Sequence, residues 1–291
     1  MYKRSIPEKI FSVFNVVILS LLAFITLYPF VYVASISFST VSEAARSGFH
    51  FFPREVTLES YKMVFNNSSL IIAYGNTIFR TVVGTLLSLL VSSMFAYSLS
   101  RNNTPFKKVV LMLLLFTMLF SGGIIPSYML IKNLGLLNNR WVYILPGLVA
   151  AYNVIILRNY FMALPGELHE SAKVDGANEF LIFFKIILPL STPVLATVAL
   201  WLAVSHWNSW MDGILYITDN DKHVIQVMLQ RLILQNELAV LGPGKGTLMQ
   251  TFSTETVKSA TIIVSIVPIL IVYPFIQKYF TKGIMLGAVK G

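Results

Sequence analysis

The sequence has little charge and no cysteine. Only 12% of its 291 residues are Asp, Glu, Lys or Arg, whereas a soluble domain carries about 25%. The absence of cysteine excludes disulfide bonds and thiolate-metal sites. His50, His169, His206 and His223 are scattered and lack ligand spacing with a carboxylate, so we expect no metal site. No Ser-His-Asp or paired-carboxylate cluster stands out, which argues against an enzyme.

Acidic side chains are missing from the middle of the long apolar segments. Proton- or sodium-coupled carriers generally need such groups as relays or ion ligands. A nucleotide-binding loop is missing as well, because Lys245 is followed by Gly246 rather than Ser or Thr, and position 239 is alanine rather than glycine. If the protein moves a solute uphill, its energy therefore comes from another chain. A stand-alone ion-coupled carrier or channel is the alternative.

Long apolar runs are abundant. Hydrophobic residues form 56% of the chain, and the mean hydropathy is +0.72. A run of about 20 residues crosses a ~30 Å hydrocarbon core as a helix. We predict an all-α polytopic membrane protein, with one transmembrane domain over residues 1–291 and an uncleaved first span. The six predicted spans are about Phe11–Phe38, Leu70–Leu99, Val109–Ile131, Trp141–Leu164, Ile186–Val204 and Ala260–Phe280.

The distribution of Lys and Arg predicts the orientation. Cations are dense at the N-terminus, after the second span, around residues 158–185 and in the tail, and they are sparse and balanced in the longer segments between. The positive-inside bias places both termini and the loop 165–189 in the cytoplasm, and the long loop 205–259 outside. This orientation explains the net charge of +9 better than binding to nucleic acid does. The four tryptophans, Tyr28 and Tyr32 then fall near the outer boundary.

Small residues form a stripe in the second span. Gly84, Ser88, Ser92 and Ala96 recur every four residues, which lets helix backbones approach closely. We favour packing within the chain over contact with a second subunit. Several spans are also interrupted by Pro or Gly, as at Gly122 and Gly123. Such interruptions suit a transport pathway, although they also occur in membrane helices without one.

The loop 165–189 reads as a helix–turn–helix elbow between two spans. Gly176 permits a sharp turn, and Asp175 is a candidate cap for the helix that follows. Leu168, Ala172 and Phe180 contribute to an expected exposed apolar patch that invites a partner protein. Periodicity alone favours a plainer alternative, an interfacial helix lying on lipid.

A motif in this loop decides between these readings. The residues that carry it are Glu170-x-Ala172, Asp175-Gly176-Ala177 and Ile186-x-Leu188-Pro189. They resemble the EAA loop of permeases from binding-protein-dependent ABC importers, with Ser171 where that family usually has alanine. Six spans, Trp207-Asn208-x-Trp210 and the glycine-rich tail resemble the smaller, maltose-type permease of carbohydrate-uptake systems. The resemblance covers nearly the whole chain.

The resemblance implies a bacterial inner-membrane subunit that forms half of a carbohydrate pore. Its implied partners are a second permease, which the resemblance favours as a different chain, an ABC ATPase dimer and an extracytoplasmic solute-binding protein. ATP and Mg²⁺ would be bound by the ATPase, and this chain would hold no cofactor and catalyse no reaction. The residues implied in coupling to the ATPase are Glu170, Ser171, Ala172, Asp175, Gly176, Ala177, Phe180, Leu188 and Pro189.

Two further sets of residues are candidates for contacts with sugar and with the binding protein. Asn76 and Arg80 share a helix face, and Trp207, Asn208 and Trp210 lie near the outer boundary. We favour structural roles for Asn76, Arg80 and the two tryptophans over contact with sugar. The family uses the long outer loop to contact the binding protein, although composition equally fits a plain connector. The candidates there are Leu241, Gly242, Pro243, Gly244, Lys245 and Gly246.

Overall fold

The computed structural model describes residues 6–46, 48–241, 255–272 and 274, with the backbone alone for 235–241. Within these residues the chain is helical apart from turns and one isolated bridge, Ser39 to Val56, and it forms no strand. It divides into two compact units, residues 1–68 with 229–267 and residues 69–228 with 268–291. The single domain predicted over residues 1–291 stays a prediction.

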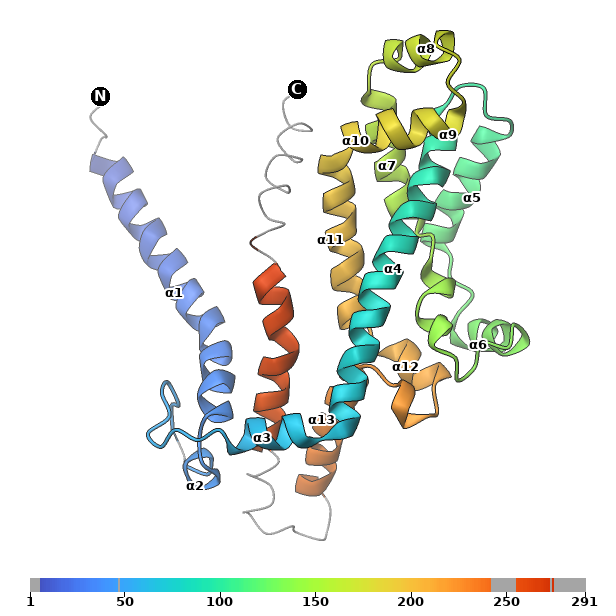
Figure 1. Cartoon of the computed structure of the whole chain (residues 1–291). Coiled ribbons are helices and arrows are strands. Elements are labelled where there is room, and N and C mark those ends of the chain that lie inside the picture. Colours follow the sequence, from blue (N-terminus) through green and yellow to red (C-terminus); the bar gives the residue numbers. More distant parts are fainter. Residues whose placement is uncertain (1–5, 47, 242–254, 273, 275–291) are drawn as a thin grey trace. The chain divides into compact units, whose positions relative to one another are not determined.

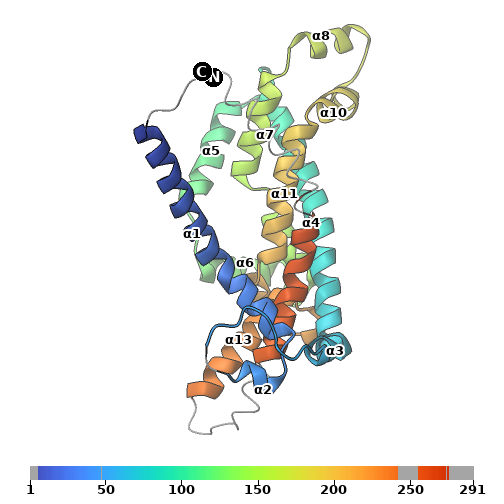
Figure 2. The same ribbon diagram turned by 90° about the vertical axis from the view of Figure 1, so that its left-hand side faces the viewer.

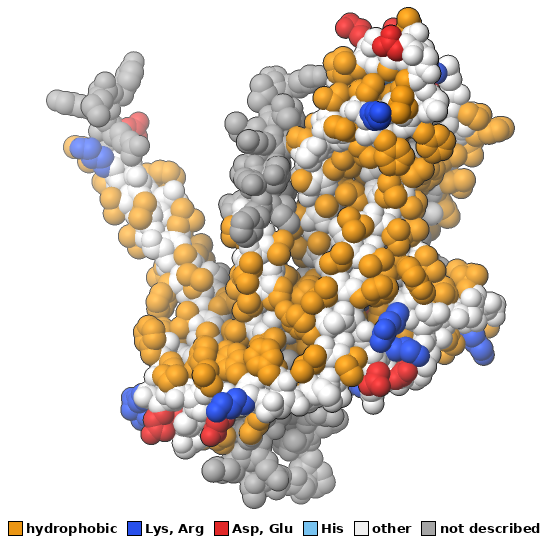
Figure 3. Space-filling view, in the orientation of Figure 1, with side chains coloured by type: hydrophobic (Ala, Val, Ile, Leu, Met, Phe, Trp, Pro, Cys, Tyr) orange, Lys and Arg blue, Asp and Glu red, His pale blue; other side chains and the backbone are white. Residues whose placement is uncertain are grey.

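The first unit is built on one long helix. Helix α1 (Ile6–Ser37) is 32 residues long, and its most apolar window has none of its residues buried within the protein. Hydrophobic side chains cover the helix along its length (Figure 3). Such a helix satisfies its own backbone groups and presents apolar side chains to lipid. Two short helices follow, α2 (Val41–Ala44) and α3 (Glu59–Asn66).

The second unit contains most of the remaining helices. They are α4 (Ser68–Ser100), α5 (Lys107–Leu119), α6 (Ile124–Asn133), η1 (Arg140–Tyr143), η2 (Leu145–Gly147), α7 (Ala151–Ala163), α8 (Glu167–Val174), α9 (Glu179–Ile182), the π-helical turn η3 (Phe183–Ile187), α10 (Leu188–Leu190), α11 (Thr192–Asn208), α12 (Met211–Tyr216) and η4 (Asn220–Lys222). Helix α13 (Ile225–Leu241) begins in this unit and ends in the first. A further helix covers Glu255–Val272.

Two hydrophobic clusters lie toward opposite ends of α4. One joins the last turns of α4 to α7, α8, η3 and α11, and includes Leu99, Leu157 and Ile182. The other gathers α6, η1 and the segment 217–227 and includes Ile144 and Val227. Figures 1 and 2 both place α8 beyond the end of α11 that α10 continues, away from α6. The second unit therefore has two separately packed ends.

Each predicted span corresponds to a helix or to a bent pair of helices. Three helices are long and apolar enough to cross a membrane, Ile6–Ser37, Ser68–Ser100 and Glu255–Val272, and three bent pairs bring the number to six if each is one span. The all-α polytopic fold predicted from hydropathy is confirmed.

The third predicted span is not one continuous helix. Helices α5 and α6 meet at 119° across a break of a few residues. Gly123 lies at the break with a φ of +85°, a conformation that side-chain-bearing residues rarely adopt. The interruption noted at Gly122 and Gly123 is therefore a sharp bend, and the fifth predicted span is bent too, by 83° between α10 and α11.

The long loop predicted over 205–259 is largely helical where the structure describes it. It contains α12, η4 and α13, and residues 242–254 lie outside the described part of the chain. Val224, Ile225 and Val227 are buried, so apolar packing orders this segment. The alternative of a plain connector rested on the glycine-rich middle of the loop, which lies mostly outside the described residues.

The small-residue stripe of α4 packs within the chain. Gly84, Ser88, Ser92 and Ala96 are all buried. A methyl group built on Gly84 would lie 2.7 Å from Nε2 of His206 on α11, closer than real contacts allow. Glycine at this position therefore lets α11 approach α4, and the reading of the stripe as intramolecular packing is confirmed at Gly84.

Candidate functional site

The elbow predicted in the loop 165–189 is present, and its turn is set by local hydrogen bonds. Helix α8 ends at Val174, and Gly176 follows with a φ of +80°. The Gly176 amide donates to the Lys173 carbonyl at 3.0 Å, and the Ala177 amide donates to the Ala172 carbonyl at 2.9 Å. These two bonds form a Schellman motif, the helix ending in which glycine is strongly favoured. The sharp turn predicted at Gly176 is confirmed, and its role in coupling to an ATPase stays a prediction.

The helix after the turn is capped by Asn178 and not by Asp175. The Asn178 side chain accepts a hydrogen bond from the Leu181 amide at 2.8 Å, which fixes the first turn of α9. Asp175 instead lies at the C-terminal end of α8. Its expected capping role was wrong because the turn is three residues longer than the sequence reading assumed.

One carboxylate, Glu179, fastens the elbow to α4. The Tyr97 hydroxyl donates to it at 2.6 Å. From α8, Lys173 Nζ lies 2.9 Å and His169 Nε2 lies 3.2 Å from its oxygens. Partial burial raises the pKa of the Glu179 carboxyl, but these three hydrogen bonds outweigh burial and hold that pKa at about 2. Glu179 therefore stays ionised and joins α8 to α4 at neutral pH.

The predicted coupling residues divide into exposed and buried members. Ala172 is only 7% exposed and packs in the hydrophobic cluster with Leu99, so it anchors α8. The expectation that Ala172 contributes to an exposed apolar patch was therefore wrong. Ala177 and Leu188 are half-buried beside the same cluster. The exposed members are Glu170, Ser171, Asp175, Gly176, Phe180 and Pro189.

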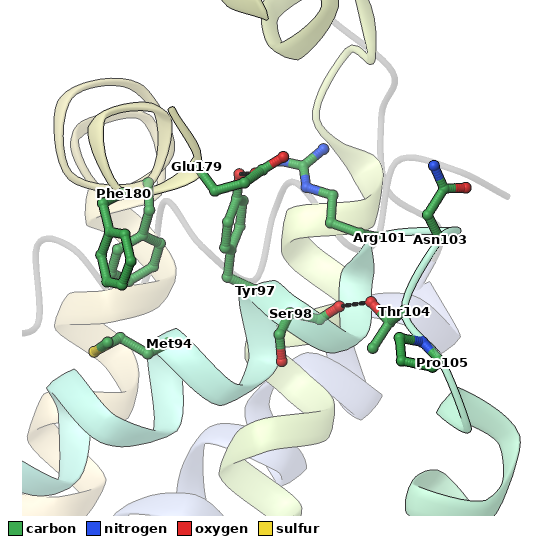
Figure 4. A pocket seen from close by; sticks show the side chains of 10 residues that line it. Met94, Tyr97, Ser98, Arg101, Asn103, Thr104, Pro105, Glu179 and Phe180 are labelled. Carbon is green, nitrogen blue, oxygen red and sulfur yellow. Dashed lines mark hydrogen bonds between the residues drawn. The ribbon is translucent and has the colours of Figure 1, made fainter. Parts of the chain in front are cut away.

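A cavity of about 420 Å³ lies where α9 meets the end of α4. Figure 4 shows Tyr97 and Glu179 meeting at its wall, with Arg101 beside them and Phe180 and Met94 across from them. The Arg101 guanidinium stacks over the Tyr97 ring, with 4.5 Å from Cζ to the ring centroid. This hollow is walled by the residues that fasten the elbow, so its shape depends on the position of α9.

The candidate substrate-path residues of α4 are engaged with protein atoms. Asn76 Nδ2 donates to the carbonyls of Asp221 and His223, each at 2.9 Å. Arg80 pairs with Asp212 through both of its terminal nitrogens and also donates to the Ser209 carbonyl. Asn76 and Arg80 are 5% and 3% exposed, respectively. Both side chains fix α4 to the segment 209–223.

The remaining candidates lie at the end of α11 or outside the described residues. Trp207 is buried and makes an edge contact with Tyr74, with ring centroids 5.8 Å apart. Asn208 is exposed, and Trp210 is half-buried in the cluster that includes Ile144. Leu241 ends α13, and Gly242, Pro243, Gly244, Lys245 and Gly246 lie outside the described part of the chain. Contacts of these residues with sugar or with a solute-binding protein stay predictions.

Sequence reasoning missed three residues that organise the two ends. Glu179 and Tyr97 are 82 residues apart, and Arg80 and Asp212 are 132 apart. The sequence carries no clear signal for Glu179, because Lys173 already has a carboxylate at i,i+3 on its own helix, Glu170. For Tyr97 and Asp212 the sequence carries no signal either. Within the described residues, no group of three His, Asp or Glu side chains is placed to hold a metal ion.

These features define a polytopic helical membrane protein with a fastened polar elbow at one end of its longest buried helix. The chain belongs to the family described as binding-protein-dependent transport system inner membrane components, whose model matches residues 103–286. Within that family it is a permease of the sugar ABC transporter type, which confirms the resemblance seen in the sequence.

Three known proteins illustrate the similarity. The polygalacturonan/rhamnogalacturonan transport system permease protein YtcP of Bacillus subtilis is 42% identical, over 94% of this chain and 96% of that protein. Protein LplC of Bacillus subtilis is 41% identical, over 97% of this chain and 96% of that protein. A solved chain from a bacterial ABC transporter involved in import of the acidic polysaccharide alginate is 34% identical, with a TM-score of 0.88, over 96% of this chain and 100% of that chain.

Proposed function

We propose that this protein is a pore-forming permease subunit of an ATP-driven oligosaccharide importer, and that it couples to an ATPase subunit through the loop 165–189. Its family and its relatives support the transport role. ATP and Mg²⁺ are then bound by the ATPase, and this chain is a non-catalytic subunit. It lies in the inner membrane with both termini in the cytoplasm, as the distribution of cations favours.

The observation that carries the coupling proposal is the fastening of the elbow by Glu179. Helix α8 keeps Glu170 and Val174 exposed, available to a partner. Its opposite face is held by Ala172 in the hydrophobic cluster, and Lys173 joins the helix to Glu179. A force applied to the exposed face therefore moves α8 and α9 together instead of bending the loop.

Helix α4 is the element that would carry this movement across the membrane. It has 33 residues, so it is about 50 Å long. Tyr97 near one end contacts Glu179, and Arg80, nearly five turns away, pairs with Asp212. Because the helix is continuous between these residues, closure of the ATPase would tilt or shift α4 and alter the packing around Asp212. This is the lever by which hydrolysis would switch the pore.

The importer requires further partners. We propose a second permease, a different chain, that completes the pore, and an extracytoplasmic solute-binding protein that delivers the sugar. The segment Leu241 to Gly246 is the proposed contact with that binding protein. Trp207, Asn208 and Trp210, with Asn76 and Arg80, stay the proposed substrate path, although hydrogen bonds to protein carbonyls and to Asp212 engage Asn76 and Arg80 in this conformation.

Uronate-containing oligosaccharides are the first substrate class to test. YtcP is named for transport of polygalacturonan and rhamnogalacturonan, and the similar solved transporter imports alginate. Both names refer to acidic glycans. Uptake by the assembled importer should be measured with oligogalacturonides, oligoalginates and neutral arabino-oligosaccharides of equal length. Transport of the neutral set alone would overturn the acidic assignment and leave the importer assignment intact.

A pair of glycine variants tests the coupling loop. Gly176→Leu forces a side chain into a positive-φ conformation that costs about 1–2 kcal/mol. Gly166→Leu adds the same side chain at a φ of −63°, which any residue adopts. Both sites have open space around the added side chain. In proteoliposomes we expect Gly176→Leu to lose uptake while the complex still assembles, and Gly166→Leu to retain it. Full uptake by Gly176→Leu, or uptake without ATP, would contradict the proposal.

A further inference from the structure

The loop between α2 and α3 folds back along α1 and carries the most exposed aromatic rings of the first unit. We call residues 48–56 the aromatic finger. Phe49 and Phe52 are 82% and 84% exposed. Single exposed apolar residues are ordinary, but two exposed phenylalanines three residues apart on one short loop expose more apolar surface than is usual. The finger therefore needs an apolar neighbour that the described protein does not provide.

Ring contacts fix the position of the finger along α1. The Phe51 ring lies 5.3 Å from that of Tyr28 and 6.2 Å from that of Phe24, between centroids. Phe49 makes an edge contact with Tyr28 at 5.8 Å, and the His50 ring lies 5.7 Å from that of Tyr32. The loop that carries the finger lies beside the last turns of α1 (Figure 1). Its phenylalanines contact Phe24 and Tyr28, and its histidine contacts Tyr32, nearer the end of that helix.

The same contacts give the depth of the finger in a membrane. Lys9 is the last charged residue before Glu43, so the uncharged part of α1 begins at Ile10. About 20 helical residues cross the hydrocarbon core, which brings its far boundary close to Pro29. Tyr28 and Tyr32 then flank that boundary, and the rings packed on Tyr28 lie at the same level. This is the zone where aromatic side chains are enriched.

The base of the finger is held by a buried carboxylate. Glu43 is 6% exposed, and its oxygens accept hydrogen bonds from the amides of Arg54 and Glu55 at 2.5 and 2.9 Å. Burial raises the pKa of Glu43, but these amides and nearby arginines prevail and lower it, so the carboxylate is ionised at neutral pH. Gly48, with a φ of +126°, makes the turn at the other end. The finger is thus a built element with both of its ends set.

We propose that the aromatic finger is a membrane-interface anchor, with Phe49 and Phe52 inserted among phospholipid acyl chains at the headgroup boundary. Exposed Arg46 and Arg54 flank the rings and suit the phosphate level of the same lipids. The anchor fixes the height of α1 in the bilayer. It depends on the membrane location of the family and not on the direction in which the chain crosses the membrane.

Cysteine labelling tests this anchor directly, because the chain has no native cysteine. In the assembled importer, Phe52→Cys and the matched headgroup-level control Arg54→Cys are labelled with an environment-sensitive fluorophore. Proteoliposomes are prepared with ordinary or acyl-brominated phospholipids. We expect brominated lipid to quench the label at position 52 severalfold more than the label at 54, and aqueous iodide to give the reverse order.

Two results would overturn the proposal. Equal quenching of both labels by iodide would place the finger in water. Shielding of position 52 from iodide and from brominated lipid alike would show that a protein, such as the second permease, covers it. A Glu43→Gln variant removes one acceptor from the base of the finger, and we expect brominated-lipid quenching at position 52 to fall.

Discussion

Two polar links join α4 to the rest of its unit, the Arg80–Asp212 ion pair and the hydrogen bond from Tyr97 to Glu179, and the carboxylates at their centres differ in burial. Arg80 is 3% exposed and its partner Asp212 is 22% exposed. Glu179, in contrast, is 47% exposed and shares its charge among Lys173, His169 and Tyr97. A buried pair cannot be broken cheaply, whereas a solvated one can be remade. The Arg80 end is therefore built to hold its structure, and the Glu179 end is built to move.

The largest effect is expected where the buried pair loses one partner. Asp212→Asn leaves the Arg80 guanidinium buried without a counter-charge, which costs about 3–5 kcal/mol. We expect a large fall in the thermal midpoint of the detergent-solubilised protein, measured by fluorescence-detected gel filtration. The double variant Arg80→Met with Asp212→Leu removes both charges and should recover most of the stability. If Asp212→Asn alone keeps the native thermal midpoint, the buried pair contributes no more stability than Glu179 does.

A smaller loss of thermal stability is expected when α4 and α11 are crowded at Gly84. Gly84→Val forces a side chain against the ring of His206, and overpacking of this kind costs about 1–3 kcal/mol. The matched control is Gly75→Val on the same helix, where an added methyl group meets no atom within 4 Å. The same thermal assay should show a lower midpoint for Gly84→Val than for Gly75→Val. Equal midpoints would mean that α4 and α11 separate without cost.

At the solvated end we expect an effect on coupling and almost none on stability. Glu179→Gln removes the charge that Lys173 contacts, and exposed pairs contribute about 0–1 kcal/mol. The thermal midpoint should therefore stay nearly unchanged, while sugar molecules imported per ATP hydrolysed decrease. Glu167→Gln, an exposed carboxylate at the start of α8, is the control and should keep the native ratio. A native ratio in Glu179→Gln would show that the fastening is not part of the lever.

The smallest effect is the response of that coupling to pH. The folded pKa of Glu179 is about 2, below its ordinary 4.5, so its contribution is complete above about 4.5 and is lost as pH falls through about 2. The difference in transport ratio between the native protein and Glu179→Gln should thus be constant from about pH 8 to about pH 5. If that difference disappears near neutral pH, a group other than Glu179 controls the coupling.

Local patterns in the sequence predicted much of the elbow. Gly176 and the flanking apolar residues specify a helix, a turn and a helix, because capping and positive φ are decided within a few residues. The exact cap was wrong, since Asp175 and Asn178 are both good capping residues and only the length of the turn selects between them. The helical structure of the segment after residue 210 was missed because its apolar residues are buried against α4 and η1, which local composition does not reveal.

Hydropathy alone determined that this is a polytopic helical membrane protein, because apolar runs of sufficient length have few other stable environments. The motif around Gly176 added the family. Only the tertiary structure decided which polar groups meet: Glu179 with Tyr97 and Lys173, and Arg80 with Asp212. Electrostatic pairing depends on the distance between groups in space, and residues far apart in the sequence come close only when the helices pack.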